Sequence, residues 1–280
     1  MKDFPSCFGE SVIQIASSTQ TAKSGAQNLV TCVYQYQSKS VSGFITVTWI
    51  KHLMGQLGLT VGIQNPTKQS LCRADIKTWL FSKRKGHKNL VSHSASLHIF
   101  WDLSSAKFGP GPEPLQGFYL AILVNQELRL LLGDLTNEAY KKIDIYNSSP
   151  SPTPSRAIFV AKKEHVFGKR LYNSKARFCD EGDVHDVRIE YDTTYDDDHC
   201  MAIYIDDKTV MRVARLKWNF RGNDTMTVDG VLIQVYWDVH SWLYQSVVGN
   251  AVFLFTSGDP NHKTSMASGF SLLLCAWKSQ

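Results

Sequence analysis

The spacing that most resembles a hydrolytic site is a pair of carboxylates, Glu190 and Asp192. Residues two apart in a strand lie on one face, so these two groups would stand side by side, as the acid and the nucleophile of a glycosidase do. Jelly-roll glycosidases commonly carry a third carboxylate two residues further on, where this chain has Thr194. The sequence also has no Gly-x-Ser-x-Gly elbow and no P-loop. We therefore predict no catalytic residue and keep a glycoside hydrolase as the enzymatic alternative.

Metal chemistry is not favoured either. Cys179, His185, His199 and Cys200 are four potential zinc ligands, but none forms a short two-ligand turn, and neighbours such as His199 and Cys200 point to opposite faces of a strand. The acidic stretch within residues 180–198 lacks the spacing of an EF-hand loop. It is typical of a solvated loop or of a partner for basic side chains. We expect no metal and no cofactor.

Two Trp-Asp pairs are candidates for a ligand-binding site. Each tryptophan ends an apolar run and each aspartate begins a turn; the residues are Trp101, Asp102, Trp237 and Asp238. Aspartate at such a place can accept backbone N–H bonds, and large aromatic side chains dominate protein cores, so a structural role is the first interpretation. The functional alternative is a pair of sugar-stacking aromatics, each with a polar partner.

Basic clusters give a candidate anion-binding patch. The formal net charge is +5 and the pI is about 8.8. The patch residues are Lys83, Arg84, Lys85, Lys88, Lys162, Lys163, Lys169 and Arg170. The structural interpretation of these basic clusters is that they lie on solvated loops. The functional interpretation is that they bind an acidic protein, an anionic membrane or nucleic acid. No specific nucleic-acid-binding motif is present. The predicted partner is an unknown protein or anionic ligand, and the oligomeric state stays open.

The cysteines and the apolar runs bear on the compartment. Six cysteines are spread along the 280 residues without a CxxC pair, and the start lacks the apolar stretch of a signal peptide. Free thiols in a soluble, intracellular protein are therefore expected. No apolar run reaches the roughly 18 residues of a membrane span. The expected location is the cytoplasm, with the nucleus or the periphery of the plasma membrane also allowed.

The elements that must hold these residues are strands. Apolar residues alternate with polar ones in short runs separated by Gly, Asn, Pro or Ser, which predicts an all-β fold of antiparallel β-sandwiches with a jelly-roll or concanavalin-like character. The hairpin around Asp206-Asp207 is the segment that indicates the jelly-roll or concanavalin-like character. The predicted organisation is a flexible arm at 1–27, a first half at 28–145, a Pro/Ser linker or loop at 146–155, and a second half at 156–280.

The two halves share one pattern. Trp79 leads to Trp101-Asp102 after 22 residues, and Trp218 leads to Trp237-Asp238 after 19. The predicted internal repeat gives two similar halves packed together, either as separate sandwiches or as one large one.

Longer segments resemble a known family. They lie at residues 3–9, 27–34, 100–108, 161–168, 220–225, 237–242 and 276–278. Together they resemble the plant domain of unknown function 868 (DUF868), nearly end to end. The resemblance implies a plant source and a β-rich fold, and it implies no reaction or catalytic residue. The favoured function is a non-catalytic intracellular binding or scaffold protein. A lectin-like carbohydrate binder and a peripheral binder of anionic membranes are two further candidate functions.

Overall fold

The computed structural model describes residues 28–37, 42–52, 57–78, 84–92, 95–109, 111–146, 157–179, 182–192, 199–244, 249–257 and 269–278. The chain divides into two compact units, the N-terminal unit (27–159) and the C-terminal unit (160–280). The predicted arm lies outside the described residues, and so does the predicted linker after Tyr146. The domain boundaries given above stay predictions.

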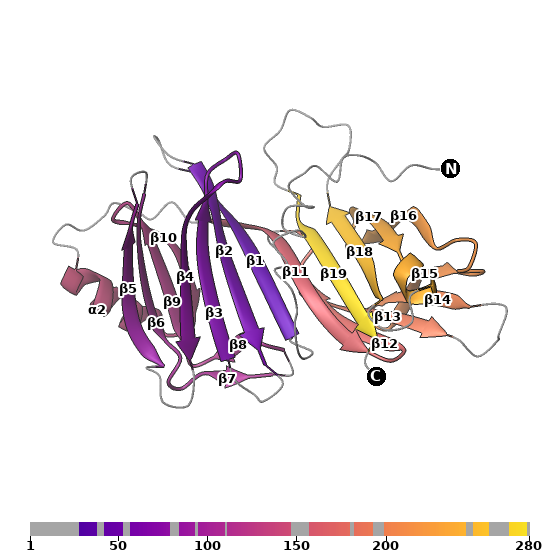
Figure 1. The fold of residues 1–280 in the computed structure, drawn as a ribbon, viewed down its shortest axis with the longest axis horizontal. Coiled ribbons are helices and arrows are strands. Elements are labelled where there is room, and N and C mark those ends of the chain that lie inside the picture. The colour runs from indigo at the N-terminus through magenta and orange to yellow at the C-terminus, as the bar shows by residue number, and fades with distance from the viewer. Residues whose placement is uncertain are drawn as a thin grey trace. The chain divides into compact units, whose positions relative to one another are not determined.

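Within the N-terminal unit, two layers of four antiparallel strands each form a sandwich (Figure 1). In the first sheet the order is β1 (Asn28–Gln37), β2 (Ser42–Lys51), β3 (Leu57–Gln64) and β4 (Ser70–Thr78). In the second the order is β10 (Glu127–Gly133), β9 (Tyr119–Val124), β6 (Ser96–Asp102) and β5 (Lys85–Val91). A small hairpin, β7 (Lys107–Phe108) and β8 (Pro114–Gln116), joins β6 to β9, and the helix α2 (Thr136–Tyr146) follows β10.

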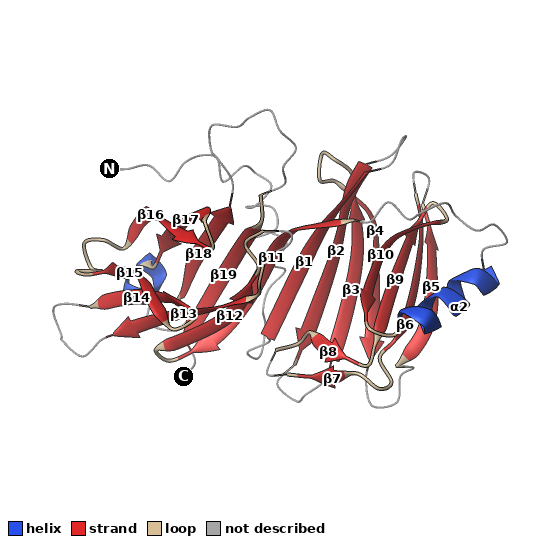
Figure 2. Ribbon diagram, turned by 180° about the vertical axis from the view of Figure 1, so that it is seen from behind, coloured by secondary structure: helices blue, strands red, loops and turns tan. Residues whose placement is uncertain are grey.

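Alternation along the strands builds the core of this unit. In β2, Ile45, Val47 and Trp49 are buried, whereas the residues between them are only half-buried. They join side chains of β6 and β9 in one hydrophobic cluster, so the two sheets pack face to face. Strand β9 is buried along its whole length because α2 packs Ala139 and Ile143 on the other face of its sheet (Figure 2).

The C-terminal unit repeats the plan of two sheets. One sheet has the order β12 (Leu171–Ala176), β13 (His185–Asp192), β14 (Cys200–Ile205) and β15 (Lys208–Val213). The other has the order β16 (Arg221–Val228), β17 (Val231–Asp238), β18 (Asn250–Ser257), β19 (Ser271–Lys278) and β11 (Ile158–Gly168). Strand β11 pairs with β19 in parallel, and the other neighbours in this unit are antiparallel.

A short helix, α3 (His240–Tyr244), closes the core of the C-terminal unit. Its Trp242 is buried and stacks on Tyr172 of β12 at 4.8 Å between ring centroids, with Phe253 of β18 edge-on at 5.7 Å. Because these rings come from both sheets and from α3, this indole ties the sandwich together. Its Nε1 donates to the carbonyl of Ala276 at 2.9 Å, so the buried polar atom is satisfied.

The predicted fold class is confirmed: strands make up most of the described chain, with two helices, and within each unit the sheets are antiparallel except for the β11–β19 pair. Individual elements differ from expectation. Strand β5 covers residues that the sequence analysis treated as part of a basic cluster, and its side chains are exposed or half-buried because it is an edge strand. Strand β15 ends at Val213, so Trp218, which the repeat pattern aligns with Trp79, lies in the turn that follows and not in a strand.

Candidate functional site

The two Trp-Asp pairs form equivalent corners, one in each unit. Trp101 near the end of β6 and Trp237 near the end of β17 are each 7% exposed. Each indole lies across a glycine of the neighbouring edge strand, Gly86 opposite Trp101 and Gly222 opposite Trp237. A glycine at an edge leaves room for the ring of its cross-strand neighbour to cover the backbone. Neither indole offers an open face for a sugar, and the ligand-binding role of these pairs stays a prediction.

The aspartates of the two corners make the same contacts. Asp102 pairs with Lys85 at 2.5 Å, and Asp238 pairs with Arg221 at 2.8 Å. The other carboxylate oxygen of each accepts the backbone N–H two residues on, from Ser104 and from His240, at 3.0 Å in both cases. This is the strand-exit role that the sequence analysis described. The matched contacts support the predicted internal repeat.

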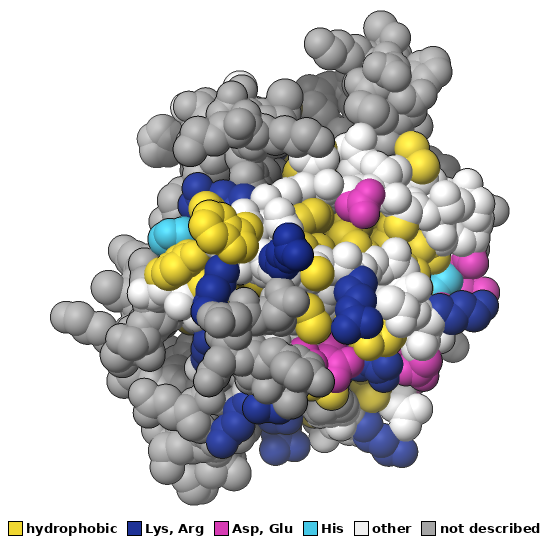
Figure 3. Space-filling model, turned by 90° about the vertical axis from the view of Figure 1, so that its right-hand side faces the viewer, with side chains coloured by type: hydrophobic (Ala, Val, Ile, Leu, Met, Phe, Trp, Pro, Cys, Tyr) yellow, Lys and Arg dark blue, Asp and Glu magenta, His cyan; other side chains and the backbone are white. Residues whose placement is uncertain are grey.

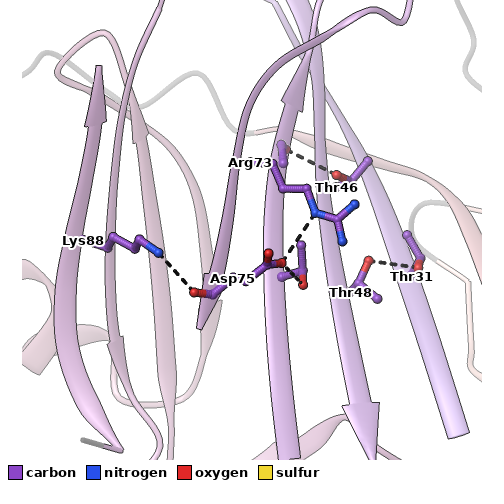
Figure 4. Close-up of polar contacts among 8 residues, drawn as sticks. Thr31, Thr46, Thr48, Arg73, Asp75 and Lys88 are labelled. Atoms are coloured by element: carbon purple, nitrogen blue, oxygen red, sulfur yellow. Dashed lines mark hydrogen bonds and ion pairs between the residues drawn. The ribbon is translucent and has the colours of Figure 1, made fainter. Parts of the chain in front are cut away.

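Part of the predicted anion-binding patch lies in the N-terminal unit. Lys85 pairs with Asp102, as described above. Lys88 donates its Nζ to the backbone carbonyl of Asp75 at 3.1 Å (Figure 4). The side chain of Asp75 in turn accepts from Thr60 at 2.7 Å and lies 3.5 Å from Nε of Arg73, and these contacts hold the pKa of Asp75 below its ordinary value. Arg84 is exposed, and Lys83 lies outside the described residues.

The outer face around Asp75 carries a row of hydroxyl side chains. Thr31, Thr48, Thr60 and Asp75 are direct cross-strand neighbours from β1 to β4. The two hydroxyls of Thr31 and Thr48 lie 3.0 Å apart (Figure 4). Cross-strand pairs of this kind stabilise a sheet. Because the row satisfies its own hydrogen bonds, we assign it to stability.

The remaining patch residues belong to β11 and the turn after it. Lys162 is half-buried, lies 3.1 Å from Glu164 and donates to the carbonyl of Lys175 at 3.2 Å. Lys163 is buried, and burial lowers its pKa. Lys169 and Arg170 are exposed. The structure thus spreads the predicted patch over two units and several environments, and its anion-binding role stays a prediction.

The hydrolytic candidates lie on β13, and two of the metal candidates, His199 and Cys200, lie at the start of the neighbouring strand β14. Glu190 is exposed and Asp192 half-buried, both on the outer face of the β12–β15 sheet. His199 lies 3.1 Å from the hydroxyl of Tyr191, and Cys200 is 3.9 Å from a guanidinium nitrogen of Arg212. Within the ranges that the structure describes, no group of three or more His, Cys, Asp or Glu side chains is placed so that it could hold a metal ion.

His185 is held by two aspartates from different sheets. The side chain of His185 is 8% exposed. Its Nδ1 lies 2.6 Å from a carboxylate oxygen of Asp206, and its Nε2 lies 2.9 Å from a carboxylate oxygen of Asp229. Asp206 is in the β14–β15 turn and Asp229 in the β16–β17 turn, so the contact clamps the two sheets of the C-terminal unit. Burial alone would lower the pKa of His185, but hydrogen bonding and the charges of Asp206 and Asp229 outweigh it and raise this pKa.

The clamp predicts a pH-dependent stability. The raised folded-state pKa of His185 means that its stabilising contribution is complete below its ordinary value of about 6.5 and is lost as the pH rises through the raised value. We expect the urea midpoint of the C-terminal unit to fall across that window, and to fall less in Asp229→Asn, which keeps an acceptor and removes a charge. Equal pH profiles for the two proteins would contradict the clamp.

An aromatic and basic surface lies at the turn between β15 and β16. We call it the Trp218 patch; its residues are Arg215, Lys217, Trp218, Phe220, Arg221 and Tyr244. Trp218 is 84% exposed and Tyr244 is 55% exposed. Trp49, Trp101, Trp237 and Trp242 are buried and Trp277 is half-buried, so Trp218 stands out among the described tryptophans. Figure 3, which faces this end of the C-terminal unit, shows hydrophobic side chains beside Lys, Arg and His side chains.

The backbone that carries Trp218 is fixed. Arg215 has a positive φ of 53°, and its carbonyl accepts the N–H groups of Trp218 at 2.8 Å and Asn219 at 3.0 Å. Leu216 is fully buried, and its N–H donates to the carbonyl of His199 at 2.9 Å. The side chain of Asn219 donates to the carbonyl of Ala214 at 2.9 Å. An ordered turn with a buried anchor therefore presents the indole to solvent.

Tyr244 and Phe220 support the patch from beside the turn. The hydroxyl of Tyr244 donates to the carbonyl of Lys217 at 2.9 Å. The Phe220 ring lies edge-on to Tyr244 at 6.3 Å, and the guanidinium of Arg221 lies 5.7 Å from the centroid of Phe220. His240 of α3 fills the space between these rings, 5.3 Å from Phe220 and 4.9 Å from Tyr244. These rings cover one another, whereas Trp218 has no ring contact within the described part of the chain.

Comparison with known proteins gives the family. The model of one family, described as a plant protein of unknown function (DUF868), matches residues 25–278. The chain belongs to this family. No curated protein and no solved structure matches it. The family resemblance expected from the sequence segments is thereby confirmed, with a match that covers both units.

Sequence reasoning about this DUF868 chain missed the Trp218 patch. It treated Trp218 only as the counterpart of Trp79, which lies outside the described residues. One signal was present: residues 209–223 hold four basic residues, Arg212, Arg215, Lys217 and Arg221, and no acidic one. Over the described part of this DUF868 chain, no helix is long and apolar enough to cross a membrane.

Proposed function

We propose that the chain is a non-catalytic intracellular binding or scaffold protein and that the Trp218 patch is its binding surface. The observation that carries the proposal is the 84% exposure of Trp218 on a turn whose backbone is fixed. Exposed apolar groups that the fold does not need to bury are typical of interaction sites, and Trp, Tyr and Arg are the residues most enriched at energetically important contacts.

The surroundings of the candidate catalytic groups also support binding over catalysis. Glu190 is exposed on an outer sheet face, where water is not excluded and a proton transfer gains little from the protein. His185 already contacts two aspartates that hold turns together. Turnover of a substrate that stops on changing one polar side chain of the described surface would contradict the proposal.

Proximity labelling in plant cells tests the binding surface. We expect the full chain fused to a biotin ligase to label a set of neighbours that Trp218→Ala loses. Leu232→Ala is the matched control, because Leu232 is 49% exposed on β17 and lies outside the Trp218 patch. An identical set of neighbours for the parent chain and both variants would exclude the Trp218 patch as the binding surface.

A further inference from the structure

We infer that the partner of the Trp218 patch is an anionic lipid bilayer, whose interface receives the Trp218 indole while the surrounding cations contact the lipid headgroups. This inference rests on the proposed function and names the partner of the same surface. It depends on three observations: the exposed indole, the charge around it, and the use of the neighbouring polar groups in contacts within the fold.

The charged side chains that make up the Trp218 patch, all among the described residues, are basic. Arg215 and Arg221 are exposed and Lys217 is half-buried, and residues 209–223 hold no acidic residue. Asp238, the acidic side chain that contacts the patch, is held by Arg221 at 2.8 Å. Basic side chains close to an anionic leaflet are each attracted to it, and the attraction falls with salt.

The exposed ring suits the membrane interface. Tryptophan and tyrosine are enriched where the apolar core of a bilayer meets the headgroups, because each has an apolar ring and a polar atom. Trp218 and Tyr244 provide these two side chains on one surface, and Tyr244 is already satisfied by its bond to Lys217. The fixed turn also means that little order is lost when the indole enters the interface.

Other partners fit less well. A sugar site needs acceptors for hydroxyl groups, but the carboxylate of Asp238 is paired and the amide of Asn219 is used within the turn. Single-stranded nucleic acid needs several open rings in sequence, and the rings of Phe220, His240 and Tyr244 lie against one another. One open indole with cations around it is the arrangement that a charged, planar lipid surface can use.

The test is sedimentation of the full chain with phosphatidylcholine vesicles that contain or lack phosphatidylserine. We expect binding only to the phosphatidylserine vesicles, weakened by added salt. Trp218→Ala should weaken it about tenfold, since an interfacial aromatic side chain supplies much of such binding. Arg215→Glu with Lys217→Glu should weaken it at least as much, because about 1 kcal/mol per cation corresponds to roughly fivefold each.

Two controls separate a specific surface from general charge attraction. Arg177→Glu with Lys208→Glu changes the same number of charges in the same unit, at the end of the β12–β15 sheet opposite the turn that carries Trp218, and Leu232→Ala removes an exposed apolar side chain. Both should bind nearly as the parent chain does. Equal losses in control and patch variants, or no binding to phosphatidylserine vesicles, would overturn the lipid partner. If vesicles fail but Trp218→Ala still removes labelled neighbours in cells, the binding function stands and only the lipid partner is wrong.

Discussion

Replacing Trp101 or Trp237 by alanine is expected to lower the free energy of unfolding of the affected unit by about 3–5 kcal/mol. Each indole is 7% exposed and lies against an edge-strand glycine, so its removal leaves a cavity at the corner and uncovers the backbone. In the C-terminal unit the loss includes the bond from Nε1 of Trp237 to the carbonyl of Asn219 at 3.0 Å. Urea unfolding followed by circular dichroism measures the change, and hydrogen exchange assigns it to one unit.

Trp218→Ala is the matched control for these two variants. The same change of residue at an exposed site should alter the free energy of unfolding by no more than about 0.5 kcal/mol. This contrast separates tryptophans that build the fold from the one that the structure leaves exposed. A loss of several kcal/mol for Trp218→Ala, or a neutral result for both corner variants, would contradict the roles assigned to them.

Adding a methyl group at the corner glycines is the second large expected effect. A Cβ at Gly222 would lie 2.3 Å from Cζ2 of Trp237, and one at Gly86 would lie 2.6 Å from Cζ2 of Trp101. Because each indole is packed in the corner and can move only by disturbing its neighbours, we expect Gly222→Ala and Gly86→Ala each to cost about 1–3 kcal/mol of unfolding free energy. The measurement is again urea unfolding.

Two comparisons show whether the indole causes this loss. Gly111→Ala adds the same methyl group where no atom lies within 4 Å, and should be nearly neutral. In a Trp237→Ala background the clash at Gly222 disappears, so Gly222→Ala should then cost much less. Full additivity of the Gly222 and Trp237 changes would show that the ring and the glycine do not depend on each other.

Much of the fold could be predicted from the alternation of apolar and polar residues, because a strand with one buried face has an apolar residue at every second position. Strand β2 is such a case, with Ile45, Val47 and Trp49 buried. The corners were also accessible, since an apolar run ending in Trp-Asp indicates a strand exit. Strand β5 was not, because as an edge strand it buries none of its side chains fully, and its Lys, Gly, His and Asn residues read as a loop.

The surfaces were harder to predict because they depend on turns and on distant residues. The exposure of Trp218 follows from the left-handed turn at Arg215, and a positive φ at a residue other than glycine leaves little trace in sequence. The clamp at His185 joins residues 206 and 229, which come together only through the topology of two sheets. Neither local composition nor periodicity contains that information.

The claim that Trp218 is the contact point with lipid is tested most directly by fluorescence quenching with brominated acyl chains. Phosphatidylserine-containing vesicles with bromine on their lipids should quench part of the tryptophan emission of the parent chain, and Trp218→Phe should remove that quenchable part while saturating lipid keeps the protein bound. The buried tryptophans Trp101, Trp237 and Trp242 should keep their emission in both proteins. Equal quenching of the parent chain and Trp218→Phe, or no quenching of vesicle-bound protein, would contradict the account.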